Sequence, residues 1–136
     1  MKKRKGIILV LCVLAVCTVG VTLCIGRGKK PYKNLDVSQI VSAAVLLSPP
    51  DKTVQITDLT ELVEYLEDVV IYNKDNSYME YAGQTVVFTL TMDDGSQTQI
   101  APYAPFLVID GVGYKTKYEP CEALNSYANR LLEKER

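Results

Sequence analysis

The feature that most constrains this chain is a run of nineteen uncharged, mostly apolar residues from Ile7 to Ile25. As a helix, a run of this length extends roughly 28 Å, close to the roughly 30 Å hydrocarbon thickness of a bilayer. Twelve of the nineteen are leucine, isoleucine or valine, and no charged side chain opposes their insertion. Residues 7–25 are therefore predicted to be a transmembrane helix that contacts membrane lipid.

Two other interpretations of this run stay open. A cleaved secretory signal also begins with basic residues and an apolar stretch, and Ala15 and Cys17 provide small residues for a peptidase. Lipidation of Cys17 is the second alternative, although Val16 directly before the cysteine fits that signal poorly. Because eight apolar or small residues continue beyond Cys17, the pattern favours an uncleaved signal-anchor.

The run divides the chain into four parts. We expect a basic tail at 1–6, the signal-anchor helix at 7–25, a basic linker at 26–34 and a single domain at 35–136. Basic residues flank both ends of the run, so the positive-inside rule decides little. A very short basic tail ordinarily stays inside, and we therefore expect a single-pass protein of the cytoplasmic membrane whose domain is extracytoplasmic.

The predicted domain and the predicted anchor region have opposite net charges. Residues 31–136 contain eight basic and sixteen acidic side chains, whereas the first thirty residues contain seven basic ones and no acid. A domain of this balance is repelled by nucleic acid and by anionic lipid, so no nucleic-acid partner is predicted. The basic stretch from Arg27 to Lys33 can still lie against lipid phosphates.

The residue inventory argues against catalysis. The chain has no histidine, which removes the usual general base and the commonest transition-metal ligand. Cys121 is the only cysteine after residue 24, so the domain cannot form an internal disulfide, and its place on an apolar helical stripe predicts a buried side chain. The polar stretch 75–80 lacks the residue order of a calcium loop. We expect no enzyme activity and no cofactor.

Periodicity predicts an α+β fold, in which the N-terminal transmembrane helix is followed by a mostly antiparallel sheet of about six or seven strands packed with two helices. The first helix follows Thr57 and Asp58, either of which can cap it. The second runs from about Glu119 to Lys134. The apolar face of the first helix is predicted to contain Leu59, Leu62, Val63, Leu66 and Val70.

Several strands can be placed with their pairing. Val41–Leu47 and Lys52–Thr57 are predicted to pair around the turn Ser48–Asp51, and a strand at Val69–Tyr72 precedes an exposed loop at 73–77. The strand Gln84–Met92 alternates apolar and polar residues.

For two further turns, the turn type can be chosen by the residue pairs that it would place opposite each other on the two strands. A bulged turn at Gly95 pairs Phe88 with Ile100, which keeps two large apolar groups together. A two-residue turn at Asp110-Gly111 pairs Ile109 with Val112. Pro102 and Pro105 lie between these hairpins and are expected to interrupt the ladder.

Two groups of residues form the predicted interaction surface. The first helix carries acidic residues with no base on its exposed face, and tyrosines surround the polar loop. Each group also has an ordinary explanation, because acidic helix faces are commonly solvated and tyrosine is common in strands. The surface candidates are Glu61, Glu64, Glu67, Tyr72, Tyr78, Tyr81 and Tyr103.

A resemblance rests on the stretch Asp51–Tyr72, on the segments "MDDGSQT" and "FLVIDGVGYKTKYEPCEAL", and on the terminal helix. These residues resemble a small extracytoplasmic domain of unknown function from Gram-positive gut bacteria, similar to tails appended to membrane peptidases of the beta-lactam sensor type. The resemblance implies an accessory or sensor domain, but the chain lacks the histidines of a metallopeptidase. It carries over no functional residue.

These observations predict a membrane-anchored extracytoplasmic accessory, sensing or interaction domain without catalytic activity. Its partner is expected to be a protein or a small molecule. The alternative is an inhibitor or immunity-like protein that binds and blocks an enzyme through the acidic helix face.

Overall fold

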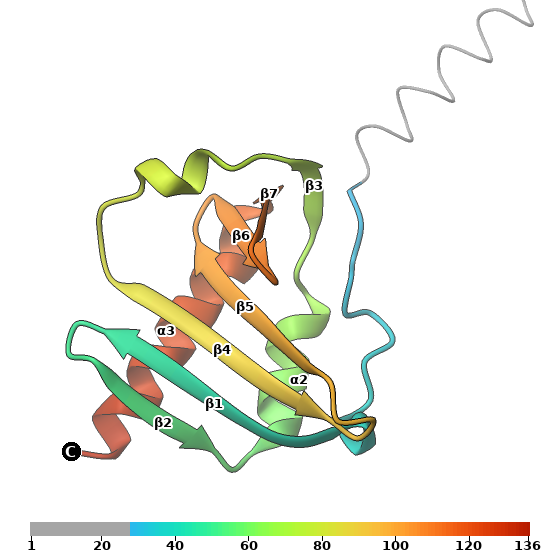
Figure 1. The fold of residues 1–136 in the computed structure, drawn as a ribbon, viewed down its shortest axis with the longest axis vertical. Coiled ribbons are helices and arrows are strands. Elements are labelled where there is room, and N and C mark those ends of the chain that lie inside the picture. Colours follow the sequence, from blue (N-terminus) through green and yellow to red (C-terminus); the bar gives the residue numbers. More distant parts are fainter. Residues whose placement is uncertain (1–27) are drawn as a thin grey trace, which may run out of the picture.

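Residues 28–136 are described by the structure, a computed structural model, so the predicted tail, the predicted span and the beginning of the linker lie outside it. One antiparallel sheet contains seven strands in the order β2-β1-β4-β5-β6-β7-β3 (Figure 1). The strands are β1 (Ile40–Ser48), β2 (Lys52–Ile56), β3 (Ile71–Lys74), β4 (Thr85–Met92), β5 (Gln97–Tyr103), β6 (Phe106–Ile109) and β7 (Val112–Thr116).

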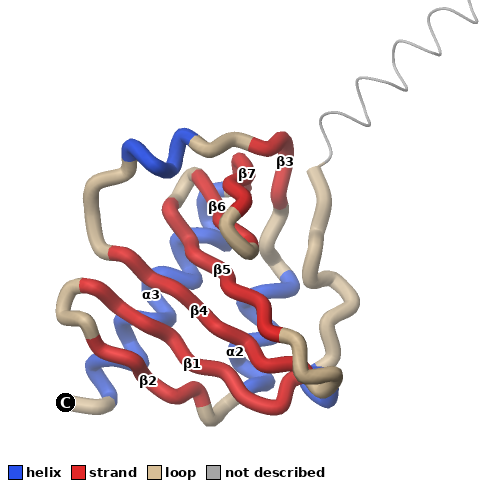
Figure 2. The backbone as a smooth tube through the Cα atoms, in the orientation of Figure 1, coloured by secondary structure: helices blue, strands red, loops and turns tan. Residues whose placement is uncertain are grey.

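Two α-helices, α2 (Leu59–Glu67) and α3 (Tyr118–Lys134), cover one face of the sheet (Figure 2). Two short 3-10 helices, η1 (Val37–Gln39) and η2 (Ser77–Glu80), lie in the connections. The predicted α+β class, with an antiparallel sheet and two helices, is confirmed. Within residues 28–136, no helix combines the length and the apolarity that crossing a bilayer requires.

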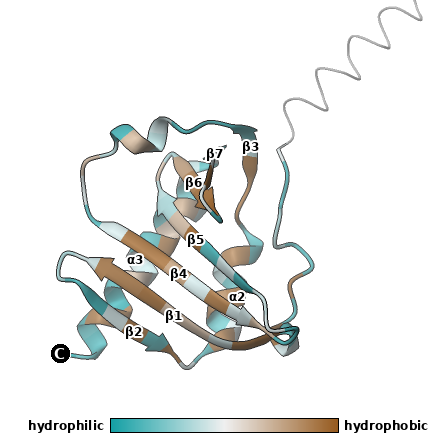
Figure 3. Ribbon diagram, in the orientation of Figure 1, coloured by the Kyte–Doolittle hydropathy of each residue, from teal (hydrophilic) through white to brown (hydrophobic). Residues whose placement is uncertain are grey.

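The core lies between the sheet and the two helices. Leu62 and Leu66 of α2 and Leu124 of α3 are fully buried against strand residues such as Phe88. Burial of each such side chain stabilises the fold by roughly 1.5–3 kcal/mol. Figure 3 shows the matching apolar stretches along β1 and β4.

An aspartate caps the N-terminus of each of the first two helical segments, η1 and α2. Asp58 begins α2, because its carboxylate accepts a hydrogen bond from the Glu61 amide at 3.0 Å. Asp36 caps η1 in the same way and completes a capping box with Gln39. The predicted pairing of β1 with β2 is confirmed, with β1 one residue longer at each end than predicted and β2 one residue shorter at its end.

The first helix is shorter than its periodicity suggests. Val70, expected on its apolar face, lies three residues beyond the end of α2. The chain turns there because the Val69 amide donates to the Leu66 carbonyl at 3.2 Å, and the Val70 carbonyl then accepts from the Lys117 amide at 2.9 Å. Val70 therefore contacts the start of α3 rather than continuing the helix.

Both register predictions are confirmed. Phe88 pairs with Ile100 around a turn in which Gly95 has a φ of 85°, as a bulged hairpin requires. Ile109 pairs with Val112 around Asp110 and Gly111, which both have positive φ. The Asp110 carboxylate also accepts a hydrogen bond from the Gln99 amide at 2.8 Å, which joins this turn to β5.

The two prolines do not interrupt the ladder, contrary to expectation. β5 continues through Pro102, which pairs with Leu107, and Ala104 and Pro105 form the short turn into β6. The amide and the carbonyl of Gln99 both bond to Asp110, so the backbone of Gln99 faces β6. Because successive residues of a strand face opposite neighbours, the nitrogen of Pro102, three residues later, faces β4. Pairing of β5 with β4 ends at Ile100, and the missing amide therefore breaks no ladder hydrogen bond.

The stretch predicted as one exposed loop, 73–77, is divided between two elements. Asn73 and Lys74 belong to β3, because Lys74 pairs with Tyr114 of β7. Ser77 begins η2. Residues 28–34, which we call the strap, run along this edge of the sheet, and Lys29 pairs with Ile71.

We predict that Gly113→Ala destabilises the domain by about 1–3 kcal/mol, the usual cost of overpacking. A methyl group there would lie 2.4 Å from the Asp75 carbonyl oxygen and 2.6 Å from the Tyr78 ring. Urea unfolding of the full chain in detergent measures the change, and limited proteolysis should show faster cleavage in residues 75–84. The neighbouring exposed substitution Val112→Thr is the control. Equal stability of the two variants would contradict the prediction.

Candidate interaction surfaces

Three of the predicted tyrosines form one cluster. Tyr103 is the last residue of β5. It is three residues after the core residue Ile100, and side chains an odd number of positions apart in a strand point to opposite faces, so Tyr103 lies on the sheet face opposite the helices. The Tyr78 ring stacks on it with centroids 5.6 Å apart, and the Tyr81 ring meets it edge-on at 5.2 Å. The predicted interaction residues Tyr78, Tyr81 and Tyr103 are therefore adjacent, although the first two come from the connection between β3 and β4 and the third from β5.

The loop that carries Tyr78 and Tyr81 is tied to β7. The Asp75 amide donates to the Gly113 carbonyl at 2.8 Å, and the Gly113 amide donates to the Asn76 side chain at 3.1 Å. The Asp75 carboxylate accepts from the amide and the hydroxyl of Ser77, at 2.9 and 2.5 Å. Because Gly113 has no side chain, Tyr78 can lie directly over β7.

Two apolar side chains project from this loop. Met79 is 71% exposed and Tyr81 is 45% exposed. Sequence reasoning named both neighbouring tyrosines but missed Met79, although a methionine between them in a polar stretch was a usable signal. We call Tyr78, Met79, Tyr81 and Tyr103 the η2 patch.

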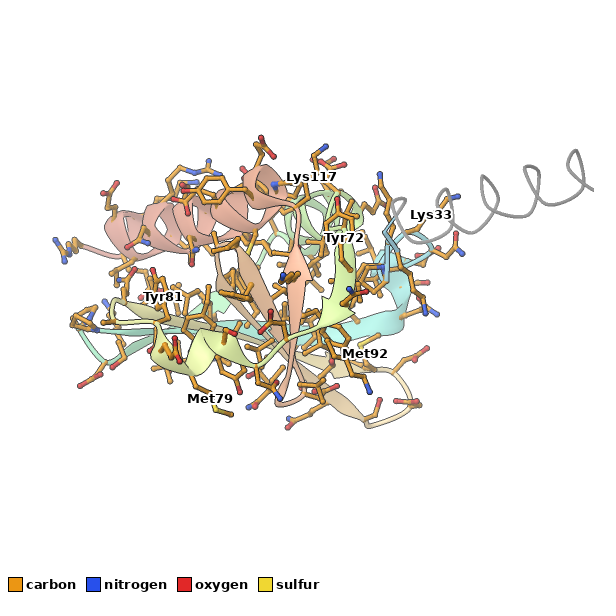
Figure 4. The ribbon with its side chains drawn as sticks, turned by 90° about the horizontal axis from the view of Figure 1, so that it is seen from above. Lys33, Tyr72, Met79, Tyr81, Met92 and Lys117 are labelled. Carbon is orange, nitrogen blue, oxygen red and sulfur yellow. The ribbon has the colours of Figure 1, made fainter. Side chains whose placement is uncertain are left out.

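Tyr72 does not belong to this patch. It lies on β3 with its ring against Gly28 of the strap and is 40% exposed. Figure 4 shows Tyr72 beside the strap, at a distance from Met79 and Tyr81. The four predicted tyrosines are thus divided between two places on the surface.

The acidic face of α2 is contacted by a basic side chain from the other helix, α3. Arg130 of α3 lies 3.7 Å from the Glu61 carboxylate, and its guanidinium lies 5.8 Å from the Tyr65 ring centroid. The arginine also donates a hydrogen bond to the Tyr65 hydroxyl. Glu64 and Glu67 are exposed, and Glu64 lines a shallow hollow of about 250 Å³ together with Glu61, Tyr65 and Asp68.

Cys121 is buried, as predicted. Its thiol is fully inaccessible and donates to the Phe106 carbonyl oxygen at 3.2 Å. Burial, with a smaller contribution from Glu122, raises the pKa of the thiol to about 12. The thiolate needed for nucleophilic attack or metal binding is therefore strongly disfavoured at neutral pH.

The carboxylates considered as ion ligands serve the local fold. Asp75 holds the first turn of η2, and Asp94 accepts hydrogen bonds from the amide and hydroxyl of Ser96, at 2.9 and 2.6 Å. These hydrogen bonds lower the pKa of both carboxyl groups below the usual 3.8. In the part of the chain that the structure describes, no three acidic or sulfur side chains are grouped so that they could hold a metal ion.

Comparisons of the chain with protein-family models, with curated proteins and with solved structures gave no match.

We predict that Ser77→Ala raises the pKa of Asp75 toward 3.8, because the side-chain hydrogen bond from Ser77 is the largest cause of the lowered value. A lowered folded-state pKa stabilises the domain above the unfolded pKa, and this contribution disappears as the pH falls through the folded value. The stability difference between wild type and variant should therefore be full at neutral pH and shrink in acid. NMR titration and unfolding at several pH values measure both effects.

Ser96→Ala is the matched control for this experiment. It removes the equivalent hydrogen bond at Asp94 and should leave the Asp75 titration unchanged. An unaltered Asp75 pKa in Ser77→Ala would show that the hydroxyl does not hold the carboxylate.

Proposed function

We propose that this chain is a non-catalytic interaction domain anchored by residues 7–25 on the extracytoplasmic side of the cytoplasmic membrane, and that the η2 patch contacts a partner protein. The observation that carries the proposal is the exposure of Met79 and Tyr81 on a loop tied to β7. This role agrees with the accessory or sensor function that the sequence resemblance implies.

The composition of the η2 patch suits a protein surface. Tyrosine is enriched among residues that contribute most to protein binding, and methionine adapts its shape to a partner. The hydrogen bonds to Gly113 hold the loop in place before binding, which lowers the entropy lost on association. Met79 and Tyr81 project outward, which suits insertion into a partner better than enclosure of a small molecule.

The acidic face of α2 gives less support to an inhibitor function. Arg130 partly neutralises Glu61, and Asp58 is engaged as the helix cap. What remains exposed is a solvated row that includes Glu64 and Glu67. A row of this kind needs no partner, because exposed carboxylates are well hydrated.

The anchoring part is tested by the location of the domain. We expect the full chain with a C-terminal tag to stay in the membrane fraction after an alkaline wash, because residues 7–25 are long and apolar enough to span it. External protease should digest the tag in spheroplasts. Release by the wash would contradict the anchor, and protection of the tag would contradict the extracytoplasmic side.

The η2 patch is tested by a photo-reactive amino acid at position 79. We expect a discrete cross-linked adduct from this position and none from position 41, whose valine is similarly exposed at 65% on β1. Removing an aromatic anchor typically weakens binding by about tenfold or more, so Tyr81→Ala should strongly reduce the adduct. The same adduct from both positions, or none from 79, would contradict the proposal.

A further inference from the structure

The strap brings one edge of the sheet close to the predicted membrane span. Only two residues, Gly26 and Arg27, separate Ile25 from Gly28. Three successive Cα–Cα steps cover at most about 11 Å. The next residue, Lys29, is fixed to β3, since its amide donates to the Ile71 carbonyl at 2.8 Å and its carbonyl accepts from the Ile71 amide at 2.8 Å.

This short, fixed connection limits where β3 can lie. Each headgroup layer of a bilayer is about 5–8 Å thick, which is half the difference between the whole bilayer and its hydrocarbon core. If residues 7–25 span the membrane, as the proposed function requires, Gly28 lies in the headgroup layer or just outside it. The edge of the sheet that holds Ile71 then lies close to the lipid surface.

Tyr72 lies at this point of closest approach. Gly28 has a φ of 66°, and a side-chain carbon on it would come within 2.7 Å of the Tyr72 ring. The tyrosine ring therefore covers the first residue of the strap while 40% of the residue stays exposed. Tyrosine is enriched at headgroup level, because its ring is apolar and its hydroxyl is polar.

Exposed lysines lie in the strap and directly before α3. Lys30 of the strap and Lys117 before α3 line one hollow of about 450 Å³ with Val70, and Asp68 and Glu119 are the acidic residues in it. Figure 4 shows Lys33 and Lys117 on either side of Tyr72. We define the lysine face as Lys29, Lys30, Lys33, Lys74 and Lys117 with Asp68 and Glu119.

Charge is unevenly distributed along residues 28–136. The strap contains three bases and no acid, whereas residues 35–136 contain seven bases and sixteen carboxylates. Exposed charges act over only about 10 Å at 0.1 M salt. An anionic surface close to β3 therefore attracts the lysine face and repels the remainder of the domain, and both effects favour the same orientation.

We propose that the lysine face, with Tyr72 within it, rests on anionic phospholipid headgroups and holds the domain with β3 toward the bilayer and β2 away from it. This inference rests on the proposed membrane anchor. It revises the expectation that the acidic domain as a whole is repelled by anionic lipid, because the acidic residues lie mainly away from the strap. The η2 patch, which lies apart from Lys33 in Figure 4, then stays accessible to a partner protein.

Single tryptophans test the orientation, because the chain contains none. Tyr72→Trp places a probe in the lysine face, and Leu46→Trp places one on β1, which four strands separate from β3. The two replaced residues have nearly equal exposure, 40% and 39%. The full chain is reconstituted in brominated phosphatidylcholine vesicles, with and without about 30% phosphatidylglycerol, whose charge attracts lysine.

We expect the bromine label to quench the tryptophan of Tyr72→Trp at least about threefold more than that of Leu46→Trp, and phosphatidylglycerol to increase the difference. Equal quenching of the two probes would overturn the proposal. Far-UV circular dichroism confirms that both variants are folded.

Charge reversal tests whether the lysines cause the orientation. In the Tyr72→Trp chain, Lys30→Glu with Lys117→Glu should reduce quenching in anionic vesicles to the value found without phosphatidylglycerol. Lys134→Glu with Arg136→Glu changes the net charge equally at the far end of α3 and should have little effect. Equal effects of the two pairs would show that only total charge matters and would overturn the role of the lysine face.

A measurement on the unsubstituted chain provides an independent test. Acetylation of Lys117 by an amine reagent should slow by about threefold or more in anionic vesicles relative to neutral ones, while Lys134 reacts equally in both. Unchanged Lys117 reactivity would overturn the proposal. Release of the chain from vesicles by an alkaline wash would overturn the anchor as well, whereas a retained chain without preferential quenching would overturn this inference alone.

Discussion

The stacking of three aromatic rings connects the buried face of the sheet to both helices. Tyr127 of α3 lies parallel to Phe88 of β4, with ring centroids 6.1 Å apart, and stacks on Tyr65 of α2 at 4.7 Å. This stack joins the middle of the sheet to both helices. Because the helices occupy one face, the connection between β3 and β4 crosses the other, where η2 and its tyrosines become accessible.

The two ends of that connection have different surroundings. β3 lies at the sheet edge beside the strap, and η2 lies over β6 and β7. Tyr72 and Tyr81 are only nine residues apart in the sequence, yet they belong to a basic face and to an apolar patch respectively. In the two roles that we propose, one surface contacts lipid headgroups and the other contacts a protein, and a single short segment separates them.

Short-range rules predicted most of the fold. The cap of α2, the bulge at Gly95 and the turn at Asp110 depend on the local backbone, so residue type predicted them, although it left Thr57 and Asp58 both open as the cap. The errors concern residues whose partners are distant in sequence. Whether a proline breaks a ladder depends on which neighbouring strand its nitrogen faces, and Val70 leaves the helix because its carbonyl bonds to Lys117.

The sequence by itself determined the apolar run, the α+β class, the pairing of the hairpins and the burial of Cys121, because hydrophobic periodicity and turn chemistry are local properties. Only the tertiary structure decided which candidate residues share a surface. It grouped Tyr78 and Tyr81 with Tyr103, left Tyr72 beside the lysines, and placed Arg130 against Glu61. These contacts depend on strand order and helix packing, which bring together residues that no local pattern connects.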